Sequence, residues 1–90
     1  MADQTQNSQK HTLVALDIAK KTHDAVIYFP SGKTVKMKVF NTLDGYSLLL
    51  ERARQHDYSI QVAFEPTADY HRNIAHWLHD QGCECFLVSS

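Results

Sequence analysis

The stretch LVALDIAKKTHDAVIY, residues 13–28, places a single carboxylate, Asp17, at the end of an apolar run. Residues 12–18 predict a strand that is apolar on both faces, as in a sheet covered on both sides. Residues 24–29 predict a second strand. An acid that closes such a strand is a candidate metal ligand, so the question is whether a second acid can join it.

The next segment predicts a third strand joined to the second by a tight turn. Pro30-Ser31-Gly32 is typical of a turn. Residues 33–39 alternate apolar and polar side chains, which indicates a strand with one solvent-facing side. Its outward lysines suit the edge of a sheet, because charges there discourage pairing with another sheet.

Two helices and two strands complete the predicted order β-β-β-α-β-α-β. Both helices are amphipathic, with apolar residues at helical spacing. Their ends are marked by capping residues and by glycine. In chain order we predict a helix over 43–56 capped by Thr42, a strand over 59–64, a helix capped by Thr67 or Asp69 and closed by Gly82, and a strand over 83–88.

This order predicts an α/β fold with a mixed sheet in the strand order 3-2-1-4-5. Right-handed crossovers place both helices on one face, so the other face is left bare and favours self-association or disorder. This arrangement opens the ribonuclease H-like fold. Strands 1 and 4 are then parallel neighbours that end at Asp17 and Glu65. Two adjacent carboxylates repel each other unless a cation lies between them.

Composition indicates one small globular domain. The chain has 90 residues, 43% hydrophobic and 21% charged, with a net charge of −1. We expect a disordered lead-in over 1–11 and one domain over 12–90. No apolar run approaches the ~20 residues of a membrane span, and no signal-peptide centre is evident, so we expect a cytoplasmic protein. Six lysines against two acids give residues 10–38 a charge of +4, which suits either a phosphate backbone or a solvated face.

Cys83 and Cys85 form a C-x-C pair. Residues two apart on a strand do not form a relaxed disulfide, so two free thiols are expected. A zinc site with His79 would lack an evident fourth ligand.

Three segments in this order carry a family resemblance: ALDIAKKTHDAVI, FNTLDGYSLLLERA and VAFEPTADYHRNIAHWLHDQGCECFLV. They resemble the N-terminal domain of DEDD-type transposases of the insertion-sequence 110 family, which are related to the Piv invertases. The resemblance covers nearly all of the chain after residue 11. It implies a partial, RuvC-like ribonuclease H fold.

The resemblance also implies a metal-dependent DNA transposase or recombinase. Asp17 matches the first acid of the family's Asp-Glu-Asp-Asp tetrad, and Glu65 matches the second. We expect these two to be catalytic and to bind Mg²⁺ or Mn²⁺, with Asp17 bridging two ions. Ala68 stands where the family has glycine, a departure that bears on the local loop. The remaining two aspartates are expected beyond Ser90, so we predict weak metal binding and no cleavage by this chain alone.

The implied partners are DNA, a structured guide RNA, and a second copy or a full-length transposase, with no membrane. Possible nucleic-acid contacts are Lys20, Lys21, Thr67 and His71. For each a structural role stays open, namely solvated surface for the lysines and His71, and a helix cap for Thr67. We further predict that Tyr70 and Trp77 lie in the core and that His76 and His79 face solvent.

Two other functions compete with the transposase. One is a non-catalytic module that binds nucleic acid or full-length transposase. The other is a fragment of an actin-like ATPase or sugar kinase, whose phosphate loop needs glycines and hydroxyls after the first acid. The segment Ala19-Lys20-Lys21 argues against that loop.

Overall fold

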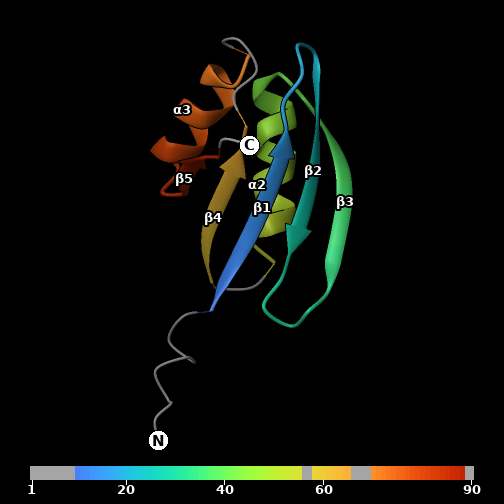
Figure 1. The fold of residues 1–90 in the computed structure, drawn as a ribbon, viewed down its shortest axis with the longest axis vertical. Helices are drawn as coiled ribbons and strands as arrows, with labels where there is room; N and C mark the ends of the chain where they lie inside the picture. Colours follow the sequence, from blue (N-terminus) through green and yellow to red (C-terminus); the bar gives the residue numbers. More distant parts are fainter. Residues whose placement is uncertain (1–9, 56–57, 66–69, 89–90) are drawn as a thin grey trace, which may run out of the picture.

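The computed structural model describes residues 10–55, 58–65 and 70–88, which form a five-stranded sheet with two helices (Figure 1). The strand order is β3-β2-β1-β4-β5. In chain order the elements are β1 (His11–Asp17), β2 (Thr22–Tyr28), β3 (Thr34–Phe40), α2 (Leu43–Ala53), β4 (Ser59–Phe64), α3 (Arg72–Asp80) and β5 (Glu84–Leu87).

The pairing confirms the predicted topology. β1 is antiparallel to β2 and parallel to β4, while β4 is parallel to β5. Both helices lie on one face, where the rings of Tyr46 on α2 and Trp77 on α3 pack with centroids 5.9 Å apart. Figure 1 shows α2 behind β1 and β2. This is the mixed α/β arrangement that begins a ribonuclease H-like, RuvC-like fold.

The core lies between the sheet and the helices. Strand positions alternate between buried and exposed, so every second residue of β1, β2 and β4 points toward α2 and α3. Burying one large aliphatic side chain contributes about 1.5–3 kcal/mol, and these contacts hold the helices on the sheet. The largest apolar residues that are fully buried are Ile27, Leu49, Ile74, Leu78, Val14, Val39 and Val62.

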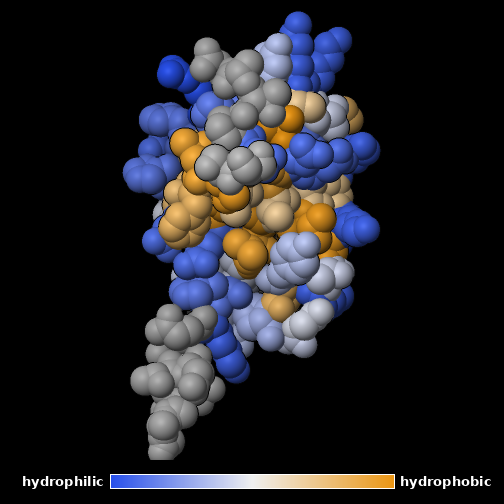
Figure 2. All heavy atoms as spheres, in the orientation of Figure 1, coloured by the Kyte–Doolittle hydropathy of each residue, from blue (hydrophilic) through white to orange (hydrophobic). Residues whose placement is uncertain are grey.

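The opposite face of the sheet carries no helix among the described residues. Apolar side chains nevertheless gather there, and Figure 2 shows them as an orange patch on the near face. The register sets Ala15 between Val26 and Ala63, with Phe86 beyond Ala63. Phe86 is 41% exposed. We call this surface the bare face; its apolar residues are Leu13, Ala15, Val26, Tyr28, Ala63, Phe86 and Val88.

Several boundaries differ from the predicted ones. α2 ends at Ala53, earlier than predicted, and β2 begins at Thr22, two residues before the predicted strand. α3 begins at Arg72 with His71 as its N-cap, whereas the sequence predicts a cap at Thr67 or Asp69. Both predicted caps lie outside the described residues. The His71 side chain makes no capping hydrogen bond, and the buried Ile74 and Leu78 hold α3 on the core.

Glycine closes α3 as predicted. Gly82 has φ +92°, a conformation that a residue with a Cβ rarely adopts. The Gly82 N–H donates to the His79 carbonyl, and the Cys83 N–H donates to the Leu78 carbonyl, with an N–O distance of 3.0 Å in each bond. These two bonds satisfy the last carbonyls of the helix and turn the chain into β5.

The boundary that we predicted between the lead-in and the domain, after residue 11, lies one residue too late. His11 already belongs to β1, where it pairs with Ser59 of β4. Residues 1–9 lie outside the described part of the chain. Within the described residues, no helix is both long and apolar enough to cross a membrane.

Candidate functional site

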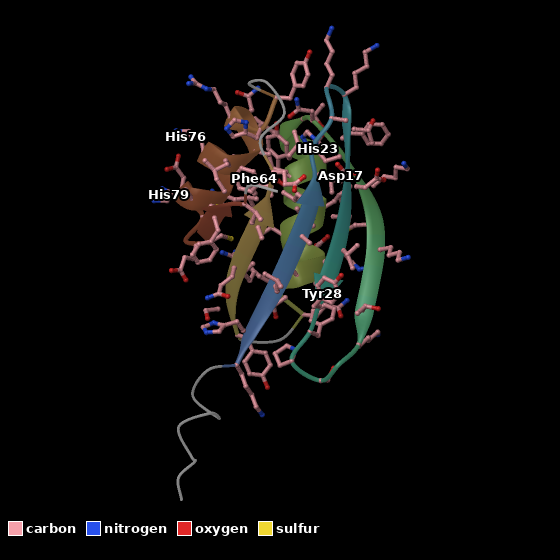
Figure 3. The ribbon with its side chains drawn as sticks, in the orientation of Figure 1. Asp17, His23, Tyr28, Phe64, His76 and His79 are labelled. Carbon is pink, nitrogen blue, oxygen red and sulfur yellow. The ribbon has the colours of Figure 1, made fainter. Side chains whose placement is uncertain are left out.

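Asp17 and Glu65 leave neighbouring parallel strands at the same level. Leu16 and Phe64 are register partners in the β1–β4 pair, so the acids that follow them emerge side by side at one end of the sheet. Leu16 and Phe64 point into the core, so both acids project from the bare face. Figure 3 shows Asp17 at the end of β1.

The two acids share one hollow of about 380 Å³. Ala15 on β1, Ala63 on β4 and Val88 directly after β5 line the rest of it, together with Leu16 and Phe64. Both carboxylates are exposed, and no ion pair or hydrogen bond engages either of them within the described ranges. Their oxygens are therefore available to a cation.

These donors suit a hard cation such as Mg²⁺ or Mn²⁺, which prefers oxygen ligands and keeps several waters. Two carboxylates do not complete such a site. Among the residues that the structure describes, no group of three or more histidines, cysteines and acids could hold a metal ion. Two carboxylates could supply only part of such a coordination shell.

Asp24 is a neighbour that the sequence analysis did not single out. It is the register partner of Asp17 across β1 and β2, so acids on these two strands and Glu65 directly after β4 lie at this end of the bare face. The Asp24 carboxylate lies 2.8 Å from Lys38 Nζ on β3. The ion pair is exposed, so it contributes little to stability, but it offsets a like-charge contact between facing strands. Alternation along the hairpin was the signal that could have identified Asp24.

Lys20 and Lys21 sit in the connection directly after Asp17, with exposed side chains. Their backbone is fastened to the end of β3. The Asn41 side-chain amide donates to the Lys20 carbonyl over 3.1 Å, and the Asn41 N–H donates to the Lys21 carbonyl over 2.9 Å. The two lysine side chains thus extend from a fixed turn beside the acids.

His71 lies apart from the acids and is half-buried, not on the surface as expected. Its ring packs against Phe64, with centroids 5.7 Å apart, and its buried Nδ1 has no hydrogen-bond partner in the part of the chain that the structure describes. Phe64 points to the helical face, so His71 is on the side of the sheet opposite Asp17. Thr67 and Ala68 fall outside the described residues.

A larger cavity of about 1030 Å³ lies on the helical face between α2 and α3. Tyr46, His71 and Trp77 line it, and neither Asp17 nor Glu65 does. Trp77 packs against the core as predicted, whereas Tyr70 is 38% exposed and is not a core residue.

The histidines of α3 and the two cysteines do not form a metal centre. His76 and His79 are exposed as predicted, with ring nitrogens 3.4 Å and 4.0 Å from the Asp80 carboxylate. Cys83 is buried and Cys85 is half-buried, and both are free thiols. Burial raises the pKa of both thiols, which disfavours the thiolate that a metal needs.

A mixed sheet whose adjacent parallel strands end in paired acids defines an α/β domain of the ribonuclease H-like class. Within that class, a family model described as a transposase, of the DEDD insertion-sequence 110 type, matches residues 14–90. The chain therefore belongs to this transposase family. No match to a curated protein was found.

Proposed function

We propose that this chain forms the N-terminal part of the catalytic domain of a DNA transposase, which cuts and rejoins DNA with divalent metal. The observation that supports this most strongly is the shared hollow of Asp17 and Glu65 at the carboxyl ends of two adjacent parallel strands. Open α/β sheets bind ligands at such ends.

In this proposal Asp17 and Glu65 hold Mg²⁺ or Mn²⁺ through their carboxylate oxygens. Asp17 stands at the centre of the sheet and is the residue that two ions can share. The bound ions would supply Lewis-acid stabilisation of phosphate oxygens and a nucleophile at neutral pH. Lys20 and Lys21 extend from the turn beside the acids, where an ammonium group can contact the DNA backbone.

Two carboxylates carry a charge of −2 against +4 for two ions. We therefore propose weak metal binding and no strand cleavage by residues 1–90 alone, with the other two aspartates of the family tetrad outside these residues. DNA, a structured guide RNA and a second copy or full-length transposase are the proposed partners.

Titration of Mn²⁺ into the purified chain, followed by the electron paramagnetic resonance of the free ion, tests the metal proposal. We expect weak binding in the wild-type chain that is lost in Asp17→Asn and in Glu65→Gln. Glu51→Gln, an exposed acid on α2, is the matched control and should bind as the wild type does. Equal Mn²⁺ binding in all four proteins would overturn the site.

A plasmid-nicking assay tests the activity. We expect no Mg²⁺-dependent nicking by residues 1–90. Robust nicking that Asp17→Asn abolishes would show instead that the two acids suffice.

A second function, a non-catalytic interaction module, is favoured by the apolar residues of the bare face. Capture of full-length transposase or nucleic acid by the chain, unchanged in Asp17→Asn and without metal, would support it. Loss of capture in Asp17→Asn would argue for the catalytic role.

A further inference from the structure

His23 is a buried histidine with a defined hydrogen bond next to the acidic site. Its side chain is 0% exposed, on the helical face of β2 (Figure 3). Its Nδ1 lies 3.1 Å from the backbone N of Ala19, two residues after Asp17. The Ala19 N–H donates, so Nδ1 is the acceptor. A neutral ring then carries its proton on Nε2.

Nε2 is buried and makes no hydrogen bond of good geometry among the described residues. Burial lowers the pKa of His23, and the side chain of Asn41, close to the ring, opposes this in part. Burying an N–H without a good acceptor is unfavourable. A charged ring would cost more, because its Nδ1 proton would face the proton of the Ala19 amide. The environment therefore favours the neutral ring with Nδ1 unprotonated.

Asn41 fastens the same connection from the other side. Its backbone and side-chain amides hold the carbonyls of Lys21 and Lys20. Its Oδ1 accepts a hydrogen bond from the Tyr46 hydroxyl on α2. Burial raises the pKa of Tyr46, so the hydroxyl keeps the proton that it donates. The residues from Ala19 to Lys21 are thus bonded to His23 on β2 and to Asn41 just after β3, and Asn41 is itself bonded to Tyr46 on α2.

We propose that His23 is a positioning residue for the acidic site: its neutral imidazole, together with Asn41, fixes the connection over residues 18–21 and thereby the direction of the Asp17 carboxylate. The consequence for metal rests on the function proposed above. The hydrogen bond itself does not depend on that function.

Few titratable groups besides His23 lie on the helical face at this end of the sheet. Tyr46 is hydrogen-bonded to Asn41, and His71 packs against Phe64. Asp17 on β1, Asp24 on β2 and Lys38 on β3 project from the bare face instead. A proton on Nδ1 removes the acceptor for the Ala19 amide and frees the turn.

Nuclear magnetic resonance of the wild-type chain tests the bond without any substitution. At pH 7.5 we expect ring nitrogen shifts of the Nε2–H tautomer for His23 and slow hydrogen exchange at the Ala19 amide. A proton on Nδ1 of a neutral ring would overturn the proposal.

A variant then tests the positioning role. His23→Leu keeps the site apolar and removes the acceptor, so Ala19 exchange should become about tenfold faster. Mn²⁺ binding should weaken by about three- to tenfold, and its decline on acidification from pH 7.5 to 5.5 should be shallower than in the wild type. His79→Gln, an exposed histidine on α3, is the control and should change neither property.

The outcomes separate this proposal from the proposed function. If the wild-type chain does not bind Mn²⁺, the proposed metal site is wrong. The tautomer of His23 and the hydrogen exchange of the Ala19 amide then still test the hydrogen bond between them. Mn²⁺ binding that is unchanged in His23→Leu, at every pH, would overturn the positioning role. Where His23→Leu does not fold, Asn41→Ala with the same measurements takes its place, since it loosens the same turn from β3.

Discussion

Leu16 and Phe64 are partners in the parallel ladder between β1 and β4, and this single register places Asp17 and Glu65 at the same height of the sheet. A shift of one residue in either strand would send one of the two acids to the helical face. The candidate site therefore depends on the core contacts that fix the register. In the absence of a cation, the two neighbouring carboxylates repel each other.

Removing one of these acids is expected to stabilise the metal-free chain slightly. Asp17→Asn relieves repulsion from Glu65 and from Asp24, its partner on β2, and should raise the free energy of unfolding by up to about 1 kcal/mol. The same variant should lose the stabilisation that Mn²⁺ gives the wild-type chain. Urea denaturation with and without Mn²⁺ measures both effects. Glu51→Gln should leave both unchanged. A marked loss of stability in Asp17→Asn would show that the Asp17 carboxylate makes a stabilising contact in the folded chain, which would contradict this prediction.

Gly45 is expected to be indispensable for the packing of α2. A Cβ at this position would lie 2.1 Å from the carbonyl oxygen of Phe40, so the helix would have to move away from the end of β3. Tyr46 would then lose its reach to Asn41. Gly45→Ala should lower the free energy of unfolding by about 1–3 kcal/mol, despite the higher helix propensity of alanine. Urea denaturation measures it; Ser47→Ala, exposed on the same helix, should be neutral or slightly stabilising.

Acid should destabilise the fold through His23. Burial lowers the pKa of His23, and the nearby Asn41 opposes this only in part. The unfolded chain therefore takes up a proton at a higher pH than the folded chain does. The stability contributed by the neutral ring is complete above about pH 6.5 and is lost as the pH falls from there toward the folded pKa.

The loss should be at most about 1.4 kcal/mol per pH unit. Urea denaturation at pH 7.5, 6.5 and 5.5 should show a steeper decline in the wild type than in His23→Leu. His79→Gln should keep the decline of the wild type. An equal pH dependence in the wild type and His23→Leu would show that His23 does not titrate in this range.

The strand order and the strand ends that carry the two acids could be predicted from the sequence. Alternating or continuous apolar runs indicate which strands face the core on one side and which on both. Residues 33–39 alternate, and β3 is the edge strand that this pattern predicts. Asp17 and Glu65 followed from the strand ends. His23 did not, since the predicted strand began at residue 24 and β2 begins at Thr22. The added residues place His23 on the inward side, whereas Asp24 already lay in the predicted strand and faces outward, where it pairs with Lys38.

The start of α3 was out of reach for a related reason. Thr67 and Asp69 are good capping residues in isolation, but α3 begins at Arg72, where Ile74 and Leu78 can reach the core. Tertiary packing, which no local pattern records, decides that boundary. The placement of His71 against Phe64 follows from the same packing.

The bare face should make the chain associate with itself. Leu13, Tyr28, Phe86 and Val88 are 36%, 44%, 41% and 43% exposed on one side of the sheet. Contiguous apolar surface of this kind is uncommon on monomers, and covering each large side chain contributes about 1.5–3 kcal/mol. The double variant Leu13→Thr, Phe86→Ser should therefore weaken association at least about tenfold and reduce binding of the dye ANS. Sedimentation velocity over a range of concentrations measures the association. Leu48→Ser is the control, because Leu48 is 56% exposed but lies on α2, away from this surface, and it should associate as the wild type does. A wild-type chain that stays monomeric and does not bind ANS at high concentration would contradict the prediction that the bare face drives association.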